Sequence, residues 1–85
     1  MVTFTYTITD ELGLHARPAG LLVKQAAGLS PEVTLLCGEK SANAKRILAV
    51  MQLGAKAGDT VTFQLQGENE ADSARVLQDF CRENL

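Results

Sequence analysis

The chain contains a single histidine, His15, which stands in a short segment rich in residues that bind anions or shape a helix start. This segment, residues 13–19, reads Gly-Leu-His-Ala-Arg-Pro-Ala. A neutral imidazole offers a nucleophilic nitrogen, and the planar guanidinium of Arg17 matches the geometry of phosphate oxygens. The combination predicts a site for an anionic group, with His15 as the candidate nucleophile.

The same segment lies where a helix is expected to begin. A start near Ala16 places Pro18 in the first turn, where a residue has no intrahelical partner for its N–H. His15 is then close to the N-cap position, although Ser, Thr, Asp or Asn would cap better, which indicates selection for another role. The backbone N–H groups of Ala16 and Arg17, with the helix dipole, could bind a phosphate on the ring. Because most lone histidines are structural, these residues alone define only a candidate anion site.

The elements that must position this segment follow from apolar spacing. Period-two alternation predicts strands over Val2–Ile8, Glu32–Cys37 and Val61–Gln66, with a short strand over Lys40–Ala42. Helical spacing predicts helices over Ala16–Ala27, around Ile47–Met51, and from Glu70 to about Arg82, with Asn69 as the cap of the last helix.

The element order is therefore β-α-β-β-α-β-α within a single domain, residues 1–85. Four strands with one apolar face each, and helices with one apolar side, predict an α+β fold. We expect a two-layer, open-faced sandwich. Apolar periodicity alone does not give the order of the strands in the sheet.

Composition excludes several classes of protein. The formal net charge of -2 argues against a general nucleic-acid or membrane-surface binder. Cys37 and Cys81 fall on predicted inward faces, and neither forms a metal-binding spacing, so we expect two core thiols and no metal or cofactor. No signal peptide and no apolar run of the ~20 residues needed for a membrane span is found. A soluble, cytoplasmic protein is the expectation.

The segment 13–19 resembles the phosphorylation-site signature of the HPr family, the histidine-containing phosphocarriers of bacterial sugar phosphotransferase systems. Residues 43–54, Asn-Ala-Lys-Arg-Ile-Leu-Ala-Val-Met-Gln-Leu-Gly, resemble the family's second signature stretch. The resemblance covers the whole chain. It implies four antiparallel strands in spatial order 1-4-2-3, covered by three helices.

The resemblance also implies a function. Such proteins accept a phosphoryl group from enzyme I, which is charged by phosphoenolpyruvate, and pass it to enzyme IIA domains of sugar permeases. The phosphate would sit on Nδ1 of His15, with Arg17 as its charge partner. The protein would be a monomeric carrier of a phosphohistidine rather than a stand-alone enzyme.

Partner docking is expected on the first helix and the short second helix. The candidates are Ala16, Gly20, Lys24, Lys45, Arg46, Ile47, Leu48 and Met51. Ile47 and Met51 fit a core role equally well, and the basic residues could be ordinary solvated charges. Arg46 stands where many family members carry a regulatory serine, and arginine cannot accept a phosphate, so that control is expected to be absent.

Two other functions remain open on the sequence. The first is a paralogue in a regulatory phosphorelay, such as a nitrogen-related branch, with the same His15 chemistry and other partners. The second is a binding module with a ferredoxin-like layout. An RNA reader of that kind would present aromatic residues on a basic sheet, whereas aromatic residues make up 5% of this chain.

Overall fold

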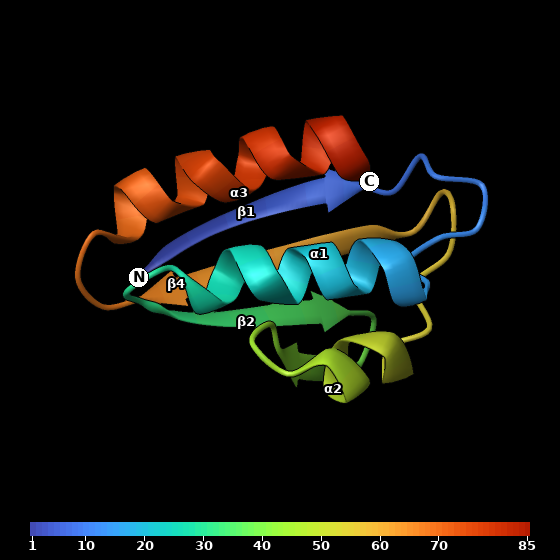
Figure 1. Cartoon of the computed structure of the whole chain (residues 1–85), viewed down its shortest axis with the longest axis horizontal. Helices are drawn as coiled ribbons and strands as arrows, with labels where there is room; N and C mark the ends of the chain where they lie inside the picture. Colours follow the sequence, from blue (N-terminus) through green and yellow to red (C-terminus); the bar gives the residue numbers. More distant parts are fainter.

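The computed structural model describes residues 1–85, and its elements follow the predicted order (Figure 1). The strands are β1 (Val2–Thr7), β2 (Glu32–Cys37), β3 (Lys40–Asn43) and β4 (Thr60–Gln66). The helices are α1 (Ala16–Ala27), α2 (Ile47–Gln52) and α3 (Glu70–Asn84). Every predicted boundary lies within about two residues of the observed one, the scatter expected at fraying element ends.

The four strands form one antiparallel sheet in the order β1-β4-β2-β3, which confirms the order implied by the resemblance. All three helices lie on one side of it, with α1 and α3 running alongside the strands and α2 near β3 (Figure 1). The opposite face of the sheet is open, as predicted. None of the helices is long and apolar enough to cross a membrane.

The core lies between the sheet and the helices. Val61, Phe63 and Leu65 of β4 are buried, whereas the residues between them point to the open face, so the predicted alternation is confirmed. The ring of Phe63 stacks on that of Phe4 in β1, with centroids 4.7 Å apart. Leu22 of α1 is fully buried on the helix side. Burial of each large side chain contributes about 1.5–3 kcal/mol, which holds α1 firmly on the sheet.

Two sequence predictions at element ends are confirmed only in part. Asn69 is the N-cap residue of α3, as predicted, but its side chain makes no capping bond, and its backbone is left-handed (φ +60°) rather than extended. The turn is closed instead by Glu70, whose Oε2 accepts the N–H of Gly67 at 2.9 Å. Cys81 is buried as predicted, whereas Cys37, at the end of β2, is only half-buried.

Candidate functional site

Gly13 and Leu14 fix the start of the site by joining the β1–α1 loop to the loop after α2. The N–H of Leu14 donates to the carbonyl of Ala55 at 2.9 Å. Gly13 has φ +69°, and a Cβ there would lie 2.5 Å from the oxygen of Ala55 and 2.8 Å from Cα of Lys56. Only glycine fits so close an approach of two backbones.

His15 is the N-cap residue of α1, as predicted. Its backbone is extended, and its carbonyl accepts the N–H of Ala19 at 2.9 Å. Its side chain makes no capping hydrogen bond and is 35% exposed. The imidazole therefore lies beside the N-terminus of α1 without accepting a hydrogen bond from it. The first N–H groups of α1 remain available to another acceptor.

Two of these N–H groups belong to Ala16 and Arg17. Neither is hydrogen-bonded within the chain, and both residues are exposed. The guanidinium of Arg17 makes no ion pair with any residue of the chain. The next residue, Pro18, is buried and has no N–H to satisfy. The end of α1 beside His15 therefore combines free amides, the positive pole of the helix and an unpaired cation, which together suit a phosphate.

A shallow pocket of about 390 Å³ brings His15 and Arg17 together. Its lining residues are Asp10, Leu12, His15, Arg17, Pro18, Leu21, Glu83 and Asn84. The patterns in the sequence did not single out Asp10, whose Oδ1 lies 4.0 Å from Nε2 of His15. The available signal was weak: an aspartate that opens a turn and accepts a backbone N–H two residues later, here that of Leu12.

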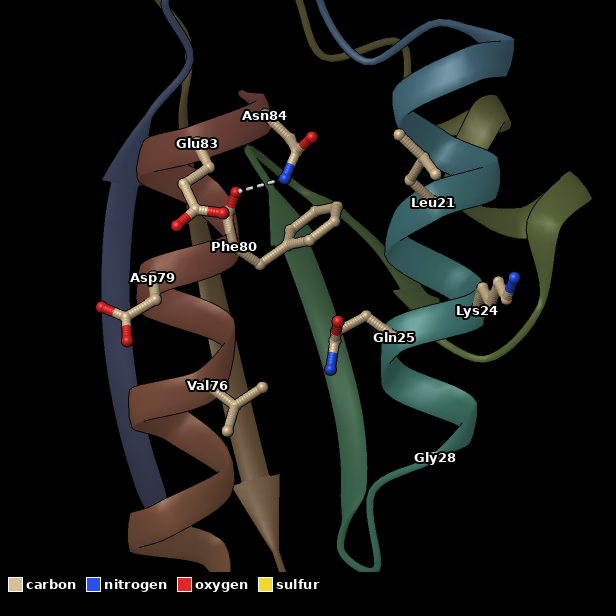
Figure 2. A pocket seen from close by; sticks show the side chains of 9 residues that line it. All are labelled: Leu21, Lys24, Gln25, Gly28, Val76, Asp79, Phe80, Glu83 and Asn84. Atoms are coloured by element: carbon tan, nitrogen blue, oxygen red, sulfur yellow. Dashed lines mark hydrogen bonds between the residues drawn. The ribbon is translucent and has the colours of Figure 1, made fainter.

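A larger groove, of about 490 Å³, lies between α1 and α3 (Figure 2). Figure 2 shows Phe80 directed from α3 toward α1, with Gln25 on the opposite wall. The groove shares Leu21, Glu83 and Asn84 with the shallow pocket but contains neither His15 nor Arg17. The smaller pocket is therefore the candidate site, because it is the one that brings the imidazole of His15 and the guanidinium of Arg17 together. No group of three or more His, Cys, Asp or Glu side chains is placed to hold a metal ion.

The predicted docking residues are mostly on the surface beside the site. Ile47 is 41%, Leu48 70% and Met51 38% exposed, so the core role considered for Ile47 and Met51 is wrong. Only Val50 of α2 is buried. Leu21 of α1 is 44% exposed. It is not among the docking residues predicted from the sequence, although its position outside the apolar stripe of α1 indicates exposure. The apolar surface on α1 and α2 thus consists of Ile47, Leu48 and Met51, next to Gly20 of α1, and of Leu21, which lines the pocket of His15.

The other predicted docking residues differ in whether their side chains already have partners within the chain. Lys24 and Arg46 are exposed and make no ion pair. Lys45 is half-buried, and its Nζ donates to the carbonyl of Leu29 at 2.9 Å, so it ties the segment before α2 to the end of α1. Gly20 lies where α1 passes α2, since a Cβ there would be 3.5 Å from Cδ1 of Ile47.

Comparison with known proteins identifies the family of this chain. Residues 2–83 match the family described as the PTS HPr component phosphorylation site. The phosphocarrier protein HPr of Mycoplasma capricolum is 45% identical over 74 residues, which cover 87% of this chain and 82% of that protein.

Solved structures of similar proteins have the same fold. A histidine-containing phosphocarrier protein of a mycoplasma has a TM-score of 0.93 at 34% identity, covering 96% of this chain and 93% of that one. Crh of Bacillus subtilis, a catabolite repression protein solved as an intertwined dimer with a swapped domain, has a TM-score of 0.77 at 34% identity, covering 100% and 98%. By profile, sequence and fold, the chain belongs to the HPr family of phosphocarrier proteins.

Proposed function

We propose that this protein carries a phosphoryl group on His15, accepting it from enzyme I and passing it to enzyme IIA domains of sugar permeases in the cytoplasm. The observation that carries the proposal is the open N-terminus of α1. There the partly exposed imidazole lies next to the unbonded N–H groups of Ala16 and Arg17. Membership of the HPr family supports the same chemistry.

The chemistry needs little covalent help from the carrier. The imidazole of His15 attacks phosphorus through Nδ1, and the bond from phosphorus to the donor's leaving atom breaks. The phosphoryl oxygens then accept hydrogen bonds from the N–H groups of Ala16 and Arg17. The guanidinium of Arg17 neutralises charge that spreads over these oxygens in the transition state. Because the guanidinium has no partner in the free protein, no existing ion pair must break before it turns to the phosphate.

Transfer also requires that a partner cover the site and exclude water. The apolar surface on α1 and α2 lies where such a partner would contact the protein. Lys24 and Arg46 add positive charge that suits acidic partners, which the family resemblance implies. We assign Lys45 a mainly structural part in this surface, because its ammonium is already bonded to Leu29.

The test is phosphorylation by a purified bacterial enzyme I with phosphoenolpyruvate and Mg²⁺, followed by intact mass. We expect one added phosphate that is lost in acid, because phosphohistidine is acid-labile whereas phosphoserine is not. His15→Ala should take up no phosphate, and its circular dichroism should match that of the unmodified chain. A mass that stays unchanged in a folded protein, or phosphate that persists in His15→Ala, would refute the proposal.

We also propose that the protein works as a monomer, although Crh was solved as a swapped dimer. The family resemblance implies a monomer, and β1 can pair along its whole length with β4 of the same chain, from Val2 with Leu65 to Thr7 with Thr60. Sedimentation velocity at micromolar and millimolar concentration tests this. A dimer at the lower concentration would contradict it.

A further inference from the structure

Asp10 faces His15 but lies outside the motif that predicts the site. Its Oδ1 is 4.0 Å from Nε2 of His15, and the same oxygen accepts the N–H of Leu12 at 2.9 Å. Its backbone is held as well, because its N–H donates to Leu85 and its carbonyl accepts the N–H of Gly13, both at 2.9 Å. These three bonds fix the carboxylate in front of the imidazole.

Neither Asp10 nor His15 forms an ion pair with any other group, although Arg17 and Glu83 line the same pocket. The remaining ion pairs of the chain join Met1 with Glu70 and Arg82 with Asp79. Both the Asp10 and the His15 side chains are about one-third exposed, at 34% and 35%. The pair therefore lies at the rim of the pocket, where a docking partner would cover it and strengthen the interaction by removing water.

The geometry points to Asp10 as the positioning residue that selects the reacting nitrogen of His15, an inference that rests on the proposed phosphoryl transfer. A carboxylate next to Nε2 favours the tautomer with its proton on Nε2, because that N–H can donate to Oδ1. Nδ1 then keeps its lone pair for phosphorus. The 4.0 Å separation is too long for a direct hydrogen bond, and a small rotation of the ring or one bridging water closes it.

The carboxylate also acts after transfer. The Nδ1 lone pair forms the new P–N bond while the donor's bond to phosphorus breaks, and that electron pair leaves with the donor. The proton on Nε2 stays in place throughout. A ring with phosphorus on Nδ1 and a proton on Nε2 carries positive charge, which the carboxylate of Asp10 stabilises. This is the form from which the phosphoryl group leaves most easily, because the departing imidazole is neutral.

The tautomer of His15 can be measured in the free protein, without any partner, from the ¹⁵N chemical shifts of the ring at a pH where it is neutral. We expect Nε2 to be protonated in the unmodified chain. Asp10→Ala should move the two ¹⁵N shifts toward each other. Asp10→Asn should keep them apart, because its amide oxygen can still accept from Nε2–H and from Leu12. Unchanged shifts in Asp10→Ala would overturn the inference.

Transfer rates give the second readout. Phosphoryl uptake from enzyme I should fall roughly 10-fold in Asp10→Ala, with partial recovery in Asp10→Asn. Asp59→Ala is the matched control, because the Asp59 carboxylate accepts the N–H of Lys56 at 2.9 Å but faces no imidazole. An equal loss in Asp59→Ala would mean that loop stability, not the ring, sets the rate. If the unmodified chain accepts no phosphate, the proposed function fails, and the tautomer shifts still decide whether Asp10 orients His15.

Discussion

The backbone carbonyl of Leu85 accepts a hydrogen bond from the N–H of Asp10 at 2.9 Å and another from the N–H of Thr9 at 2.7 Å. The residue that follows α3 therefore holds the loop that carries His15, although the two are far apart in sequence. The side chain of Leu85 is buried, so packing keeps the carbonyl in place. A site at the start of α1 thus depends on the end of α3.

This dependence predicts the effect of Leu85→Ala. Loss of the buried side chain should lower the free energy of unfolding by about 2 kcal/mol. It should also speed hydrogen exchange at the N–H groups of Thr9 and Asp10, which bond to the same carbonyl. Urea unfolding and hydrogen exchange measure these effects. Leu12→Ala is the control, because Leu12 is 74% exposed, and it should change stability by less than about 0.5 kcal/mol.

Gly13→Ala should be costly for two separable reasons. The left-handed backbone (φ +69°) disfavours any side chain, and the new Cβ would lie 2.5 Å from the oxygen of Ala55. Gly54 has a similar backbone, with φ +66°, but open space around it. We expect Gly54→Ala to cost about 1 kcal/mol, and Gly13→Ala to cost about 2 kcal/mol more. Equal costs in urea unfolding would show that the contact with Ala55 yields without strain.

Arg17→Ala should slow phosphoryl uptake from enzyme I on the order of 100-fold, the usual effect of removing one charge-stabilising donor. Its unfolding free energy should change by less than about 0.5 kcal/mol, because the exposed guanidinium makes no ion pair in the chain. Arg17→Lys should recover only part of the rate, because an ammonium keeps the positive charge but lacks the forked geometry of a guanidinium. Arg75→Ala on α3 is the control, as another exposed arginine without an ion pair, and a matching loss of rate there would remove Arg17 from the mechanism.

Much of this architecture could be predicted because it depends on local patterns. Alternation in β4 identifies its buried face at Val61, Phe63 and Leu65, and the helix start at Ala16 follows from Pro18 and the apolar spacing after it. These signals lie within one element and need no knowledge of its neighbours. The sheet order came only through the family resemblance, because periodicity carries no information on which strands pair.

The contacts that sequence patterns missed join distant residues. Lys45 looked like a free surface charge, but its ammonium satisfies the carbonyl of Leu29, 16 positions earlier. Asn69 has the side chain of a helix cap, but the turn closed between Gly67 and Glu70 sets its backbone in the left-handed region. Such roles depend on where two elements meet, which only the folded chain determines.

Glu70 should make stability depend on pH in the acid range. Hydrogen bonds from the α-ammonium of Met1 and from the N–H of Gly67 hold the pKa of its carboxyl below the usual 4.5. The folded state thus binds a proton less readily than the unfolded state. The stability that Glu70 contributes is present above pH 4.5 and is lost as pH falls through the lower, folded value.

Glu70→Gln should therefore flatten the acid side of a plot of unfolding free energy against pH. Glu68→Gln is the control, because Glu68 is exposed and forms no ion pair in the chain. It should leave the slope as it is. Parallel curves for Glu70→Gln and the unmodified chain would rule out this linkage.

Cys81 should make stability depend on pH in the alkaline range, where stability falls as pH rises. Burial raises the pKa of its thiol from 9.0 to about 12, partly offset by the positive charge of Arg82. The unfolded chain therefore releases this proton at lower pH than the folded chain, so stability is full below pH 9.0 and declines as pH rises toward 12. Cys81→Ala should reduce the alkaline slope, whereas Cys37→Ser should not.

Iodoacetamide near neutral pH should modify half-buried Cys37 well before Cys81, and equal rates would mean that the core opens without unfolding.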